Sequence, residues 1–301
     1  MKNLSGVFPP IVTPFDSDGG LLIDGFRANI ERWGQYRLGG LTVLGSNGES
    51  PYLSDEEKLK LVRAARQQMG AGRTMIVGAG RESTRLCLQF IRKIADLGAD
   101  YALVGTPCYF KASMNDDTLF AHFSTVADAS PIPVLIYNVP QFTGVHTSPA
   151  LIEKLSALEN IAGMKDSSGN LPFQAEVRRR TPERFHLLVG SAPTFLASLI
   201  QGACGGIVAI GGPLPAQTVE LYEIFASGDW QAAAKVQERL TPPAVAVTTM
   251  FGIPGLKAAM SLMGYVGGEP RLPLLPLNDR QRTTLISIFQ AAGAVDAGQR
   301  C

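Results

Sequence analysis

The chain has 301 residues, 46% of them hydrophobic and 18% charged, so it can close a large core and does not have the composition of a disordered protein. A formal net charge of +1, without a run of basic residues, argues against a nucleic-acid partner or an acidic membrane surface. No apolar run approaches the ~20 residues of a membrane span, and the opening residues do not resemble a signal segment. We therefore expect a cytoplasmic protein that acts on a small molecule.

Eight short apolar runs recur along the chain, and amphipathic, helix-like runs separate them. In chain order, the predicted strands span residues 6–14, 39–46, 74–80, 100–107, 132–140, 161–167, 186–191 and 205–210. Near-continuous apolar strands are typical of a parallel sheet that is buried on both faces. Eight such units within roughly 225 residues fit an α/β fold of the (β/α)8 type, a TIM barrel, better than an open sheet.

Three of the intervening helices carry start signals. Ser54 and Glu57 form a predicted capping box ahead of an apolar-periodic run that extends to Met69. The segments Asn-Asp-Asp at 115–117 and Thr-Ser-Pro at 147–149 open the helices after the fourth and fifth strands.

The strand signals stop after Ser227-Gly228, and the rest of the chain has helical periodicity. Helices are predicted over about 229–247, 251–263 and 278–290, with breaks at Pro242-Pro243, Gly267-Gly268 and 270–276. The sequence therefore predicts two domains, a catalytic barrel over residues 1–227 and a helical C-terminal domain over residues 228–301.

Lys165 stands in an otherwise apolar strand, IAGMKDS. In a (β/α)8 barrel the active site lies at the carboxyl ends of the strands, where this lysine is expected. If the strand is covered on both faces, desolvation disfavours the ammonium, and a free amine can attack a carbonyl carbon. Taken alone, the stretch favours the commoner case, a strand-end lysine paired with Asp166 or another carboxylate, because lysines with a perturbed pKa are a minority.

Three further strand ends carry reactive groups. The second ends in GSNGE, where two glycines allow a turn with exposed N–H groups and Ser46 and Asn47 add donors, so this loop is either an anion clamp or an ordinary turn. The fourth ends in TPCYF with Tyr109, which could simply pack on a neighbour, and the fifth ends in YNVP with Tyr137. An amine and a phenol on adjacent strands, facing a donor-rich loop, are the groups that imine chemistry requires.

Metal-binding residue types do not cluster in the sequence. The four cysteines are Cys87, Cys108, Cys204 and Cys301, and the three histidines are His122, His146 and His186. None of them has CxxC, HxH or HExxH spacing, so we expect a reduced protein without a catalytic metal or other cofactor.

Together these motifs resemble those of the dihydrodipicolinate synthase and N-acetylneuraminate lyase family of class I aldolases. The likeness extends from GVFPPIVTPF through GSNGE, TPCYF, YNVP, GMKDS and LVGSA to FGIPGLK. It implies a Schiff-base-forming lyase with a (β/α)8 barrel and a helical C-terminal domain, usually a homotetramer built as a dimer of dimers. Members form an imine between a lysine and pyruvate or another 2-oxo acid.

The resemblance also implies roles for single residues. Lys165 would be the imine-forming lysine and Tyr137 the proton-relaying tyrosine. Ser46 would supply the hydroxyl of the relay and part of the carboxylate site, and Tyr109 would be inserted into the neighbouring subunit's site. Gly190 and Ile207 match positions that line the family's pocket. Asn47 and Ser167 are further candidate substrate-binding residues, which the resemblance itself does not assign.

Two departures narrow the expected function. Dihydrodipicolinate synthases resemble one another in a Thr-Thr pair after the second strand and in an arginine two residues after YNVP, which holds the carboxylate of the aldehyde substrate. Here these places hold Ser46-Asn47 and Phe142, and an apolar ring cannot replace a bidentate carboxylate clamp. The motifs look instead like those of the 4-hydroxy-2-oxoglutarate aldolase branch, which yields pyruvate and glyoxylate. Candidates for the distal carboxylate are Asn47, Ser167 and Lys111.

Two other reactions stay open within the resemblance. One is a condensation of pyruvate like that of 4-hydroxy-tetrahydrodipicolinate synthase, and the other is the dehydration of a 2-keto-3-deoxy sugar acid. A barrel that binds a 2-oxo acid without turnover is disfavoured, because Lys165, Tyr137 and Tyr109 are all present.

Overall fold

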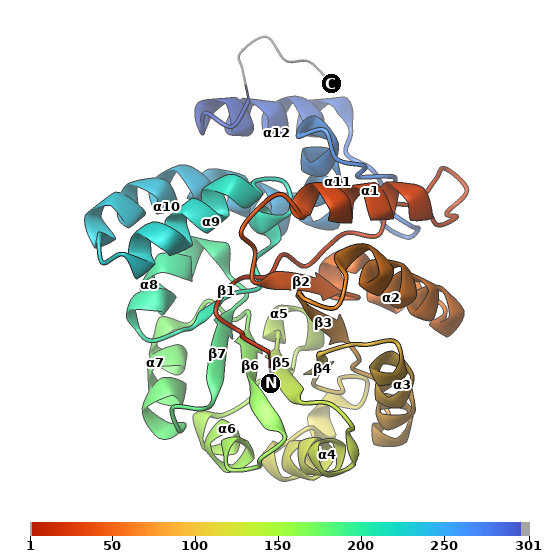
Figure 1. Ribbon diagram of the computed structural model, residues 1–301, viewed down its shortest axis with the longest axis vertical. Coiled ribbons are helices and arrows are strands. Elements are labelled where there is room, and N and C mark those ends of the chain that lie inside the picture. The colour runs from red at the N-terminus through yellow and green to blue at the C-terminus, as the bar shows by residue number, and fades with distance from the viewer. Residues whose placement is uncertain (1, 296–301) are drawn as a thin grey trace.

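The computed structural model describes residues 2–295, so Cys301 and the end of the predicted C-terminal domain lie outside the described residues. Within that range, parallel strands form one sheet in the order β1-β8-β7-β6-β5-β4-β3-β2 (Figure 1). The strands are β1 (Gly6–Val7), β2 (Gly40–Val43), β3 (Thr74–Gly78), β4 (Tyr101–Gly105), β5 (Val134–Asn138), β6 (Ile161–Asp166), β7 (His186–Val189) and β8 (Gly205–Gly206). Each predicted strand is present and lies within its predicted range.

Backbone contacts between the first and second strand segments close the sheet into a barrel. Pro10 forms a parallel bridge with Thr42, whose N–H donates to the carbonyl of Pro9 at 2.9 Å, and the N–H of Ile11 donates to the carbonyl of Thr42 at 2.9 Å. Regular pairing in β1 ends at Val7, before two prolines that have no N–H to donate to a ladder. The predicted (β/α)8 barrel is confirmed.

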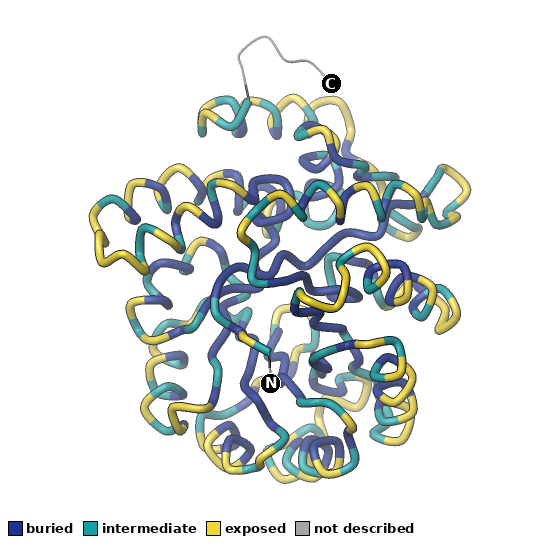
Figure 2. The backbone as a smooth tube through the Cα atoms, in the orientation of Figure 1, coloured by how far each residue is buried: buried dark blue, intermediate teal, exposed yellow. Residues whose placement is uncertain are grey.

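Helices cover the outside of the barrel (Figure 1), and their exposed faces surround the buried strands (Figure 2). They are α1 (Ile23–Trp33), α2 (Asp55–Met69), α3 (Thr84–Asp96), α4 (Asp116–Ala129), α6 (Pro149–Ser156), α7 (Leu171–Arg180) and α8 (Phe195–Ile200). The short helix α5 (Pro140–Thr143), directly after β5, is not part of this outer layer and lies within the ring of strands in Figure 1. The predicted starts are confirmed: Ser54 and Glu57 form the capping box of α2, and the Asn115 and Ser148 side chains cap α4 and α6.

Alternate side chains along the strands divide the core into two parts. Ile136 and Met164 belong to the larger cluster, which includes the buried faces of the surrounding helices. Leu135 and Tyr137 belong to the smaller cluster, which lies inside the barrel. Lys165 follows Met164 in β6, so it points into the barrel with Tyr137.

Within residues 2–295, four α-helices follow β8 and gather along one side of the barrel (Figure 1). They are α9 (Pro215–Ala226), α10 (Trp230–Val245), α11 (Gly252–Leu262) and α12 (Asp279–Ala291), with a π-helical segment at Ala246–Met250. In this part of the chain no helix is both long and apolar enough to span a bilayer. The division into domains at residue 227 stays a prediction, as does the cytoplasmic location.

Pro242 and Pro243 lie inside α10, so the break predicted at this pair is wrong. A proline inside a helix removes a backbone hydrogen bond and crowds the preceding turn. In α10, however, Pro243 is buried together with Leu240 and Ala244. Burial of this face stabilises the helix enough to override the local preference.

Candidate active site

Lys165 of β6 lies beside Tyr137 of β5. The two residues are register partners in the parallel ladder, and Lys165 Nζ lies 4.2 Å from the centre of the Tyr137 ring. Only 4% of Lys165 and 9% of Tyr137 are exposed. The structure thus brings the predicted amine and phenol together in the barrel interior, where a covalent adduct would be shielded from water.

The carboxylate of Asp166, next in β6, is occupied by neutral donors. Its Oδ1 accepts a hydrogen bond from Asn138 Nδ2 at 2.7 Å, and its Oδ2 accepts from Gln174 Nε2 and Ser168 Oγ, each at 2.8 Å. Asp166 is fully buried. The alternative in which Lys165 pairs with Asp166 is therefore wrong, since neighbouring residues of a strand point to opposite sides.

Ser46 brings a hydroxyl to the same place. Its Oγ lies 3.3 Å from Tyr137 Oη, so either hydroxyl can donate to the other. Ser46 begins the 3-10 turn Ser46–Gly48 that follows β2. The carboxyl ends of β2, β5 and β6 therefore contribute a hydroxyl, a phenol and an amine to one cluster of polar side chains.

The turn that carries Ser46 is flanked by two left-handed residues that are not glycines. Leu44 has a φ of 57° and Glu49 a φ of 54°, a region that costs such residues about 1–3 kcal/mol each. The expectation that the glycines of GSNGE supply the freedom for this turn is wrong, because neither Gly45 nor Gly48 has a positive φ. Gly48 instead allows close packing, since a Cβ there would lie 3.1 Å from the carbonyl oxygen of Ile11.

Two N–H groups of this turn take no part in its internal hydrogen bonds. Gly48 N–H donates to the Gly45 carbonyl and Glu49 N–H to the Ser46 carbonyl, both at 3.0 Å. The N–H groups of Ser46 and Asn47 donate to no acceptor among residues 2–295. The loop therefore offers two backbone donors beside the Ser46 hydroxyl, an arrangement suited to a carboxylate or oxyanion.

Gly190, directly after β7, leaves room for two groups of the site. A Cβ on Gly190 would lie 1.8 Å from Ser167 Oγ and 3.0 Å from Lys165 Cε. Ile207, directly after β8, is fully buried in the cluster inside the barrel. The predicted pocket-lining residues Ser167 and Gly190 therefore lie next to the lysine side chain.

Tyr109 does not join the buried group, because 79% of it is exposed. Its ring packs edge-on against Phe110, with centroids 5.0 Å apart. Glu82 Oε2 accepts hydrogen bonds from the N–H groups of Cys108 and Tyr109, both at 2.9 Å, and so fixes the segment after β4. Burial alone would raise the pKa of Glu82, but these hydrogen bonds hold it below its usual value. Insertion of Tyr109 into a neighbouring subunit stays a prediction.

Phe142, at the place of the missing arginine, lies in α5 and is 67% exposed. Lys111 lies beside the same segment: its Nζ is 3.9 Å from the point where a Cβ on Gly144 would lie. An ammonium group is therefore available next to α5, although the side chain of Phe142 cannot bind an anion.

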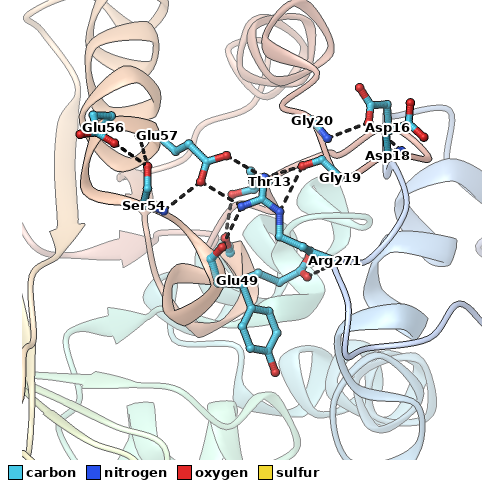
Figure 3. Close-up of polar contacts among 12 residues, drawn as sticks. Thr13, Asp16, Asp18, Gly19, Gly20, Glu49, Ser54, Glu56, Glu57 and Arg271 are labelled. Atoms are coloured by element: carbon cyan, nitrogen blue, oxygen red, sulfur yellow. Dashed lines mark hydrogen bonds and ion pairs between the residues drawn. The ribbon is translucent and has the colours of Figure 1, made fainter.

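Glu49 is part of a buried network that was not predicted from the sequence. Its Oε1 lies 2.5 Å from Lys257 Nζ of α11, with the two side chains 0% and 1% exposed. Its Oε2 accepts from the backbone N–H of Arg271 at 2.8 Å (Figure 3). The Arg271 guanidinium makes a bidentate contact with Glu57 and holds the pKa of that carboxyl below its usual value. Burial lowers the pKa of Lys257, and the Glu49 carboxylate opposes this shift. In the sequence, this network could have been suspected only from Glu49 in GSNGE and Lys257 in FGIPGLK, two charged residues in motifs to which no partner was assigned.

A closed parallel barrel with a buried lysine beside a tyrosine, at the carboxyl ends of its strands, has the construction of a Schiff-base aldolase. The sequence matches the Dihydrodipicolinate synthetase family over residues 3–292. The chain belongs to this family, whose members are lyases of the Schiff-base aldolase type.

Curated relatives and solved structures agree with this family. The 4-hydroxy-tetrahydrodipicolinate synthase of Methanothrix thermoacetophila is 35% identical over 285 residues, which cover 94% of this chain and 95% of the relative. The synthase of the same name from Archaeoglobus fulgidus is 34% identical over 286 residues, covering 95% and 97%. The structure of dihydrodipicolinate synthase from Acinetobacter baumannii, complexed with pyruvate, has a TM-score of 0.93 at 27% identity and covers 97% of this chain and 100% of that one.

Proposed function

We propose that this chain is a Schiff-base lyase that cleaves a small 4-hydroxy-2-oxo acid, best represented by 4-hydroxy-2-oxoglutarate, to pyruvate and an aldehyde such as glyoxylate. The observation that carries the proposal is the buried amine of Lys165, 4.2 Å from the Tyr137 ring centre, whose hydroxyl lies 3.3 Å from that of Ser46. These groups supply a nucleophile and a proton relay in one water-poor place.

The mechanism begins with attack of the Lys165 amine on C2 of the substrate. Loss of water gives a protonated imine, which serves as an electron sink. The C4 hydroxyl gives its proton to Tyr137 Oη as Tyr137 passes its own proton to Ser46, the C4–O bond becomes the carbonyl of the aldehyde, and the electrons of the C3–C4 bond move into the imine. The aldehyde leaves, an enamine of pyruvate remains on Lys165, and protonation at C3 followed by hydrolysis frees pyruvate and the amine.

The two substrate carboxylates need separate partners. The N–H groups of Ser46 and Asn47, with the Ser46 hydroxyl, suit the carboxylate next to C2. For the distal carboxylate we propose Lys111, because its ammonium lies beside α5 near the place where the resemblance expects an arginine. A lysine binds a carboxylate as a point charge rather than through a bidentate fork, so Lys111 would select less strictly for geometry.

A second candidate function is condensation of pyruvate with an aldehyde. The names of the relatives favour it, since they are 4-hydroxy-tetrahydrodipicolinate synthases. Phe142 disfavours it, because no bidentate cation follows Tyr137 in α5. The two functions share the imine of Lys165 and differ in the second substrate.

Borohydride reduction in the presence of pyruvate, followed by peptide mass mapping, tests the shared step. We expect one stable adduct at Lys165, its loss in Lys165→Ala, and its retention in Lys154→Ala, which removes an exposed lysine of α6. An adduct elsewhere, or none, overturns the Schiff-base mechanism.

Turnover assays then separate the reactions. We expect pyruvate release from 4-hydroxy-2-oxoglutarate to exceed pyruvate consumption with a carboxylate-bearing aldehyde and water loss from keto-deoxy sugar acids. Lys111→Ala should raise the KM for the dicarboxylate without reducing trapping of pyruvate. Preferential condensation would replace the proposed cleavage while leaving the imine in place.

A further inference from the structure

We propose that Glu49 and Lys257 form a positioning pair, a buried ion pair through which the C-terminal helices hold Ser46 against Tyr137. The inference rests on the relay proposed above for Ser46. Neither member of the pair is assigned a contact with substrate, so the pair acts through the loop that it holds.

The first step of the argument is the short backbone path from Glu49 to Ser46. The N–H of Glu49 donates to the carbonyl of Ser46 at 3.0 Å, so the two residues are the ends of one closed turn. Glu49 has a φ of 54°, and such a conformation persists only where the surroundings impose it. A displacement of Glu49 would therefore be passed directly to the residue whose hydroxyl lies 3.3 Å from Tyr137 Oη.

The second step is that the Glu49 side chain supplies this constraint. One carboxylate oxygen lies 2.5 Å from Lys257 Nζ and the other accepts from the N–H of Arg271 at 2.8 Å. Both charged side chains are buried, and the preceding carbonyl, that of Gly48, accepts from Thr13 Oγ1 at 2.7 Å. Because a buried charge without its partner is strongly disfavoured, the loop conformation that keeps Glu49 beside Lys257 is selected over others.

The third step concerns the other contacts of the C-terminal residues. Lys257 Nζ also donates to the carbonyl of Glu269 at 2.6 Å and lies 4.3 Å from the centre of the Phe15 ring. The Arg271 guanidinium lies 4.2 Å from the same ring and binds Glu57 at the start of α2 (Figure 3). The C-terminal part therefore binds the β2–α2 loop at Glu49 and the first turn of α2 at Glu57, and both of its cations lie against the Phe15 ring.

None of these contacts involves the residues around the lysine amine. Lys257 contacts Glu49, Glu269 and Phe15, whereas the amine of Lys165 lies against the Tyr137 ring. The pair is thus a positioning element for the Ser46 hydroxyl and not a source of protons for the reaction.

A double-mutant cycle between Lys257→Met and Ser46→Ala tests the proposal. In correctly folded protein, Lys257→Met should lower kcat by at least about tenfold, because a displaced catalytic group loses its alignment. Trapping of pyruvate at Lys165 should be retained. In the Ser46→Ala background, Lys257→Met should lower kcat no further, which a purely structural role would not produce.

A matched control is available at the opposite end of the strands. Arg66→Met removes the ion pair with Asp100, whose atoms are 2.6 Å apart and whose side chains are 16% and 18% exposed, at the start of β4. It should lower thermal stability while kcat of the folded fraction stays at the wild-type value. If Lys257→Met does not fold, the neutral double variant Glu49→Gln/Lys257→Met, which leaves no unpaired charge, takes its place in the cycle.

The outcomes separate this inference from the function on which it rests. Wild-type kcat in folded Lys257→Met, or a full additional loss in the Ser46→Ala background, overturns the positioning pair alone. A wild-type kcat in Ser46→Ala overturns the relay and the positioning pair together. If the wild-type protein forms no borohydride adduct with pyruvate at Lys165, the Schiff-base mechanism itself is overturned.

Discussion

Gly190 and Ser167 approach each other so closely that a Cβ on the glycine would lie 1.8 Å from the serine Oγ. The same atom would lie 3.0 Å from Lys165 Cε. The absence of a side chain at the end of β7 therefore leaves the space that the serine and lysine side chains occupy.

Gly190→Ala should impair turnover by displacing Ser167 and the lysine side chain. A misplacement of about 1 Å at a reacting group can cost on the order of 100-fold, so a fall of 10- to 100-fold in kcat/KM is expected. Steady-state assays with circular dichroism would measure it. Gly72→Ala is the control, because a Cβ there meets no atom within 4 Å. Equal activities of the two variants would contradict the assigned crowding.

Tyr137→Phe should slow turnover while still permitting an imine with pyruvate. The phenol hydroxyl is assigned to proton transfer, a contribution of roughly 100- to 10,000-fold, whereas the amine that forms the imine is unchanged. Single-turnover kinetics combined with borohydride trapping would separate the two steps. Wild-type turnover in this variant would remove Tyr137 from the relay.

Asp166→Ala should destabilise the fold. Removal of the carboxylate leaves the buried amide groups of Asn138 and Gln174 without an acceptor, at a total cost of roughly 3–5 kcal/mol in the free energy of unfolding. Urea unfolding would measure this value. Ser168→Ala removes only a less buried partner of the same carboxylate and should cost much less.

His122 should make stability depend on pH below neutrality. It is 6% exposed, its Nδ1 lies 2.8 Å from Thr84 Oγ1, and burial lowers its pKa from 6.5 to about 4, with the charge of Glu82 opposing the shift. Between these values the unfolded chain binds a proton that the folded chain does not. Proton uptake therefore favours the unfolded chain in this interval. The contribution of neutral His122 to the free energy of unfolding is fully present above pH 6.5 and is lost as the pH falls toward 4.

The size of this effect is roughly 1–3 kcal/mol over that interval. Urea unfolding of the wild-type protein and of His122→Gln at several pH values would measure it. The variant should show a flatter dependence of the unfolding free energy on pH, and parallel curves would refute the assignment.

The barrel could be predicted from the sequence because each of its strands and helices is indicated by a short continuous stretch of residues. Continuous apolar strands and capped helices alternate along the chain, and the caps at Ser54, Asn115 and Ser148 lie where the residue types place them. Lys165, Tyr137 and Ser46 could be brought together because strand ends in such a barrel share one edge.

The features that escaped prediction depend on distant packing. Arg271 binds Glu49 from 222 residues further along the chain, and nothing near either residue indicates that contact. The left-handed backbone of Leu44 and Glu49 likewise contradicts the local preference, which pointed to the glycines beside them. Pro243 inside α10 is a third case, in which burial outweighs a residue's usual tendency to end a helix.

The contact between Glu49 and the C-terminal residues has a consequence for synthesis of the protein on the ribosome. All eight strands are made before Lys257 and Arg271 emerge, so a nascent chain can pair its strands while the glutamate still lacks a counter-charge. The positioning pair proposed above therefore predicts that the turn carrying Ser46 acquires its final shape only after α11 and the segment around Arg271 have docked.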